Sequence, residues 1–113
     1  MLHEGFDDEV NAAFDQSQIL GGAYLDELAV GRKLLVQTDN TLYIIEHRKD
    51  GLYISGDQEF CPEPTKCSIH GSNFGGSMLK MNFVGRGMFL EFTVDGRIGV
   101  IVTCQILEVT EIT

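Results

Sequence analysis

The feature that most constrains the fold is the close spacing of turn signals after residue 30. Short runs of apolar and β-branched residues alternate with Gly, Asp and Asn, and Pro is nearly absent. Such runs predict strands, because β-branched and aromatic side chains suit a pleated surface while Gly and Asp suit turns. The expected strands cover residues 33–38, 41–48, 52–55, 66–70, 78–84, 88–94, 97–103 and 105–110.

The clearest strand signal lies in residues 88–94. Its residues alternate between one set that is apolar throughout and a second set that is mixed. A period of two places alternate side chains on opposite faces of a strand, so one face is expected in the core. Asp95-Gly96 follows directly and is the strongest hairpin signal in the chain.

This rhythm predicts a mainly β domain over residues 31–113, a small antiparallel barrel or sandwich of six to eight short strands, SH3-like or similar. Residues 1–30 are predicted to form an acidic helical segment before it. Phe6, Val10, Ala13 and Phe14 make one apolar stripe at helical spacing. The helix is expected to end before the paired glycines Gly21 and Gly22. The apolar residues at 24, 25 and 28 fit either a short helical turn or an extended entry into the sheet.

The net charge of −9 is concentrated at the N-terminus. Seven acidic and no basic residues precede Arg32, whereas ten acidic and eight basic residues follow from there, a net of −2. A nucleic-acid-binding protein needs a basic face, so nucleic acid is an unlikely ligand. The acidic segment is either a solvated helix face or an element that docks on a basic partner. In its sharpest form, the second interpretation is an acidic inhibitor of a nucleic-acid-binding protein.

The chain shows no sign of a membrane or secretory location. No apolar run approaches the roughly 18–20 residues of a spanning helix, and the N-terminus lacks the basic and apolar regions of a secretory signal. The chain has three cysteines, an odd number, which cannot all pair within one chain. We therefore expect a cytoplasmic protein with reduced thiols.

The expected binding site is a glycine-rich loop, predicted to contact a ligand or a partner. Consecutive glycines let backbone N–H groups converge on an anion, and loops carry function often. The sequence lacks the Gly-Lys-Ser/Thr of a phosphate-binding loop and leads into a strand rather than a helix. A plain inter-strand loop is the alternative. The loop consists of Gly71, Ser72, Asn73, Phe74, Gly75, Gly76 and Ser77.

Among Cys61, Cys67 and His70, only Cys67 and His70 have the spacing of half a zinc site, and a second pair of ligands at short spacing is missing. We therefore predict no metal, no cofactor and no catalytic residue. A cysteine nucleophile paired with His70 is the least favoured alternative, since nothing in the flanking sequence marks an activated thiol.

The stretch from residue 78 to residue 92 holds more Met and Phe than one face of a small barrel can bury. Phe83 and Phe89 are expected on the face opposite the core. Exposed Met and Phe mark contact sites, so self-association is one interpretation. Cover by the N-terminal helix is the other.

Together these features predict a non-enzymatic binding module that contacts a protein partner, which can be a second copy of the chain. The contact surface is expected to be the glycine-rich loop, the strands beside it and the acidic segment. A protein that binds a nucleotide or another phosphorylated signal is the alternative, with Tyr43, Tyr53 or Phe74 stacking on a ring.

Overall fold

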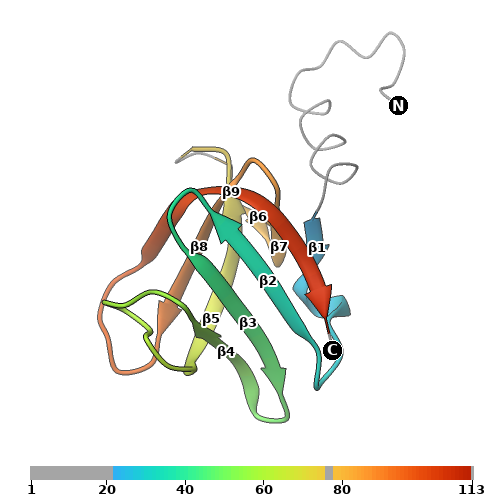
Figure 1. Cartoon of the computed structure of the whole chain (residues 1–113), viewed down its shortest axis with the longest axis vertical. Helices are drawn as coiled ribbons and strands as arrows, with labels where there is room; N and C mark the ends of the chain where they lie inside the picture. Colours follow the sequence, from blue (N-terminus) through green and yellow to red (C-terminus); the bar gives the residue numbers. More distant parts are fainter. Residues whose placement is uncertain (1–21, 76–77, 113) are drawn as a thin grey trace, which may run out of the picture.

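The computed structural model describes residues 22–75 and 78–112, and these form one β-rich body (Figure 1). One short 3-10 turn and a series of strands follow each other along the chain. In order they are β1 (Gly22–Tyr24), η1 (Leu25–Glu27), β2 (Lys33–Thr38), β3 (Leu42–Arg48), β4 (Gly51–Ser55), β5 (Thr65–Asn73), β6 (Lys80–Met81), β7 (Phe83–Gly85), β8 (Phe89–Val94) and β9 (Ile101–Ile112).

Six of these strands close into an antiparallel barrel. Their order is β4-β3-β2-β9-β8-β5, and β5 pairs back with β4 to complete the ring. The prediction of a mainly β fold built as a small barrel is confirmed, and the sandwich alternative is wrong. β5 divides one of its edges between two partners, since its start pairs with β4 and its end with β6.

The barrel interior is filled by the inward half of each alternating strand. In β8 and just before it, Met88, Leu90, Phe92 and Val94 are buried while the residues between them are partly exposed, as the two-residue period predicts. Phe92 contacts the ring of Tyr43 edge to face, with centroids 6.0 Å apart. Full burial of such side chains contributes about 1.5–3 kcal/mol each. The packed interior therefore supplies most of the stability of the barrel.

The last strand differs from its prediction. Residues 97–103 and 105–110 were expected as two strands, whereas 97–100 form a loop and β9 runs unbroken from Ile101 to Ile112. β9 pairs first with β8 and then with β2, and both ladders contain a register shift. Such bulges bend a strand without ending it. The chain can therefore arch over the end of the barrel, as the red ribbon in Figure 1 shows.

Residues 78–84 also depart from the expected single strand. Residues 78–79 are outside any strand, and Asn82 separates β6 from β7 with a φ of 59°. A residue in this left-handed region ends an extended run. β7 then pairs with β1 in a separate two-stranded sheet beside the barrel.

At the N-terminal side, the helix expected around Phe6–Phe14 lies outside the described residues. The sequence left open whether the residues from 24 to 28 are helical or extended. Both occur in succession, because β1 is extended and η1, which follows it, is one 3-10 turn. Leu25 and Leu28 are buried and belong to the barrel core. None of the helical structure within residues 22–75 and 78–112 is long or apolar enough to cross a bilayer.

Candidate functional site

The glycine-rich segment is only partly a loop. Gly71, Ser72 and Asn73 are buried residues of β5, so the expectation of a loop over these three is wrong. Phe74 and Gly75 form the bend that follows, and residues 76–77 lie outside the described residues. The strand continues because its end pairs with both β6 and β8.

Close packing of β6 against β5 explains why residue 71 is a glycine. A Cβ at this position would lie 2.1 Å from the carbonyl oxygen of Lys80 on β6, and the φ of 141° is one that other residues rarely adopt. Only a residue without a side chain lets β6 approach β5 this closely. The glycine therefore holds β6 in place rather than forming part of an anion cradle.

The two polar residues after it bond to the protein itself. The Ser72 hydroxyl donates to the carbonyl of Phe83 at 2.6 Å, which fastens β7 to β5. The Asn73 carboxamide oxygen accepts the N–H of Gly75 at 2.9 Å and shapes the bend. Because that N–H is already bonded, it does not point toward a ligand.

A polar cluster that the sequence did not reveal lies on the outer face of β5 and β8. Nδ1 of His70 lies 3.1 Å from one carboxylate oxygen of Glu91, and the other oxygen accepts a hydrogen bond of 3.4 Å from Asn73. His70 is placed there by the register shift between Ile69 and Gly71. The alternation of residues 88–94 predicts that Glu91 faces outward, but only the strand pairing reveals its partners.

This cluster has the elements of a proton-transfer site but not of a phosphate site. Glu91 fixes one ring nitrogen of His70, and within the described residues Nε2 makes no hydrogen bond. A carboxylate-oriented imidazole is a common acid–base group. However, the carboxylate lies beside the bend at Gly75 and repels an anion there. The arrangement therefore disfavours the nucleotide-binding alternative.

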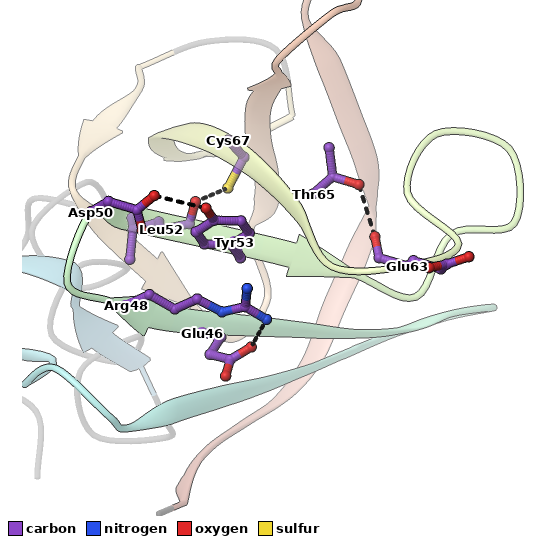
Figure 2. Close-up of polar contacts among 8 residues, drawn as sticks. All are labelled: Glu46, Arg48, Asp50, Leu52, Tyr53, Glu63, Thr65 and Cys67. Carbon is purple, nitrogen blue, oxygen red and sulfur yellow. Dashed lines mark hydrogen bonds and ion pairs between the residues drawn. The ribbon is translucent and has the colours of Figure 1, made fainter.

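The cysteines do not join His70. Cys61 and Cys67 are buried in the core, whereas His70 lies on the outer face of the same strand as Cys67. Burial raises the pKa of Cys67 to about 12, and its thiol donates to the carbonyl of Leu52 at 3.6 Å (Figure 2). A nucleophile or zinc ligand needs a thiolate, which this environment opposes. In the described part of the chain, no three His, Cys, Asp or Glu residues are grouped to hold a metal ion.

The aromatic residues expected to stack on a ligand are also engaged elsewhere. Tyr43 is buried in the core, and its hydroxyl donates to Asp57 at 3.3 Å. The guanidinium of Arg48 lies 4.1 Å from the centroid of the Tyr53 ring and covers it. Figure 2 shows Arg48 on β3 and Tyr53 on β4.

The segment directly after the loop exposes large apolar side chains. We define the apolar segment as Met78, Leu79 and Met81, which are 54%, 41% and 69% exposed. Lys80 stands between Leu79 and Met81 in the sequence, and its ammonium lies 4.2 Å from the centroid of the Phe83 ring. Phe83 itself is buried, so its expected place opposite the core is wrong.

A second exposed apolar group lies at the other end of the barrel. It consists of Ile98, Val100 and Val102 in and after the β8–β9 loop. Asn73 pairs with Phe89 at the start of β8, whereas this loop follows the end of β8. The two apolar groups are therefore separated by the length of a strand.

Comparison of the chain with family models finds no match, and neither a curated protein nor a solved structure matches it significantly. The candidate site consequently stands on the geometry of this barrel alone.

Proposed function

We propose that the protein is a non-enzymatic binding module that associates with a second copy of itself through the apolar segment. The bend at Phe74 and Gly75 lies beside this surface and belongs to the contact. The acidic residues before position 22 lie outside the described residues, so their contact with a partner stays a prediction.

The observation that supports this proposal is the exposure of three large apolar side chains within four residues. Soluble proteins rarely leave such a group in water unless it meets another surface. Full burial of one methionine or leucine contributes about 1.5–3 kcal/mol, and these partly exposed side chains gain about half of that each. A symmetric contact buries the group twice, which favours association strongly.

A second copy is a partner that the composition of the apolar segment allows. In a two-fold contact the same patch meets itself, so a charge on the patch would face a like charge. The only charged residue of this stretch is Lys80, and its ammonium lies over the Tyr24 and Phe83 rings. Met78, Leu79 and Met81 are themselves uncharged, so the apolar segment is compatible with its own copy.

The test is sedimentation velocity of the full chain over a range of concentrations. Wild type is expected to shift from monomer to dimer as concentration rises. The double variant Met78→Ser, Met81→Ser is expected to remain a monomer with an almost unchanged melting temperature, because both side chains are exposed. Ile98→Ser is the matched control, since Ile98 is exposed at the other end of the barrel.

Two results would contradict the proposal. One is a wild-type chain that remains monomeric at every concentration. The other is a dimer that the Met78→Ser, Met81→Ser variant keeps and the Ile98→Ser variant loses, which would move the contact to the β8–β9 loop.

A further inference from the structure

The outer face of the barrel carries a transverse row of polar side chains opposite the core. Lys33, Glu46, Tyr53 and Lys66 come from β2, β3, β4 and β5 and are paired directly across the strands. Arg48 extends this row, with its guanidinium over Tyr53 and a 3.0 Å bond to Glu46 (Figure 2). Residues paired in this way share one face of a sheet.

This outer face carries a net positive charge, whereas the chain as a whole is acidic. It and its edges hold five of the eight basic residues and the carboxylates of Glu46, Asp50 and Glu111, a net charge of +2. These carboxylates pair with Arg48, Lys66 and Arg32, which leaves the charges of Lys33 and Lys49 as the excess. The remaining described residues hold three basic and nine acidic residues, a net charge of −6. Within the described residues Lys33 makes no ion pair, so its charge is available. The five basic residues are Arg32, Lys33, Arg48, Lys49 and Lys66.

An aliphatic row runs beside the polar one. Leu35 of β2 pairs with Ile44 of β3, and both point outward because their neighbours in sequence are buried. Leu42 is 43% exposed on the same face, and Ile112 of β9 pairs with Lys33. The face therefore offers an apolar strip with a basic border.

From this we propose that residues 1–21 of the same chain dock on the outer face of β2, β3 and β4. These residues hold five carboxylates and no Lys or Arg, together with the apolar stripe Phe6, Val10, Ala13 and Phe14. They match the face in both properties, acidic to basic and apolar to apolar. The remaining described residues together carry a net negative charge, which disfavours contact with the same segment.

The chain enters at a place that allows this contact. Residue 22 begins β1, which lies beside β9, and β9 pairs with β2 at the border of the face. Twenty-one residues span about 30 Å as a helix and about 70 Å when extended, enough to cross several strands spaced about 5 Å apart. Because the segment is tethered, its effective concentration reaches the millimolar range.

This inference is independent of the proposed self-association, which uses the apolar segment after β5. It assigns the N-terminal acidity to a contact within the chain, instead of the partner contact that charge alone predicts.

The test is zero-length cross-linking of the full chain with a carbodiimide, followed by peptide mass spectrometry. The reagent joins a carboxylate to a lysine amine only where the two are in contact. We expect the carboxylates of residues 4–15 to join Lys33 and Lys66, and not Lys80, which lies over the Tyr24 and Phe83 rings. Equal mixtures of light and heavy isotope-labelled chains distinguish links within one chain from links between copies.

Two changes should reduce these links several-fold. Salt at 1 M shortens the screening length to about 3 Å and weakens the charged contact. The double variant Phe6→Ser, Phe14→Ser removes the apolar part without changing charge. The control variant Leu79→Ser should leave the links unchanged, because it alters only the surface proposed for self-association.

Links spread evenly over Lys33, Lys49, Lys66 and Lys80 would overturn the proposal, since they would show no preferred face. Mixed links between heavy and light chains, in the statistical proportion expected for contact between copies, would also overturn it. The absence of any link from the carboxylates of residues 4–15 would likewise overturn the proposal.

Discussion

Substitution of Gly71 by alanine tests how β6, and with it the apolar segment, is held against the barrel. The new methyl group would lie 2.1 Å from the carbonyl oxygen of Lys80 and 3.0 Å from the amide nitrogen of Asn82. Both contacts are with backbone, which cannot rotate away as a side chain does. β5 and β6 must therefore move apart, or β6 must lose its pairing with β5 altogether.

The expected loss of stability has two sources. The φ of 141° is strained for alanine and costs about 1–3 kcal/mol. The steric overlap costs about 1–3 kcal/mol more. Gly87→Ala is the matched control, because Gly87 also has positive φ, at 86°, but nothing lies within 4 Å of its Cβ position. That variant should lose only the conformational part, about 1–2 kcal/mol.

Thermal unfolding followed by circular dichroism measures the difference. For a domain of this size 1 kcal/mol corresponds to about 4–8 °C, so Gly71→Ala should melt roughly 10 °C below Gly87→Ala. Equal melting temperatures for the two variants would refute the reasoning, since they would show that β6 does not lie close to β5. The Gly71→Ala variant should also dimerise more weakly if β6 detaches.

Further predictions concern the barrel interior. Ser72→Ala should cost about 1–3 kcal/mol in chemical denaturation, because it leaves a buried carbonyl oxygen without its donor. Phe92→Ala should cost about 3–5 kcal/mol by the same assay. Thiol titration of the native protein should find Cys104 reactive and Cys61 and Cys67 slow, since burial raises the pKa of both buried thiols. The raised pKa of Cys67 favours its neutral form, so its contribution to stability is full below pH 9, declines as pH rises toward 12, and is measurable as a falling denaturation midpoint.

Much of the barrel was predictable because its strands follow simple local rules. β2, β3 and β8 match their predicted ranges to within one residue, since each has an apolar or β-branched run ended by a turn residue. Two of the strands that differ, β5 and β9, change partner along their length. β5 and β9 run past the expected ends because pairing to a second strand extends them, and local sequence does not contain that information.

The candidate site was predicted less well for the same reason. The glycines of the 71–77 segment suggested a loop, yet Gly71 serves close strand packing, which depends on a segment nine residues later. The contact of His70 with Glu91 depends on a bulge in the β5–β8 ladder. The surplus of apolar residues after position 77 was visible in the sequence. Only the structure shows which of them face solvent: Met81 does and Phe83 does not.

The most direct test of the central claim uses the methionine methyl groups. In protein labelled with ¹³C-methyl methionine, a soluble paramagnetic agent broadens the signals of exposed methyl groups. Met88 is buried and should stay sharp at all concentrations, as an internal reference. We expect the Met78 and Met81 signals to broaden in dilute samples and to become protected as the dimer forms. Equal broadening of both signals at every concentration, in a sample that does dimerise, would contradict the account.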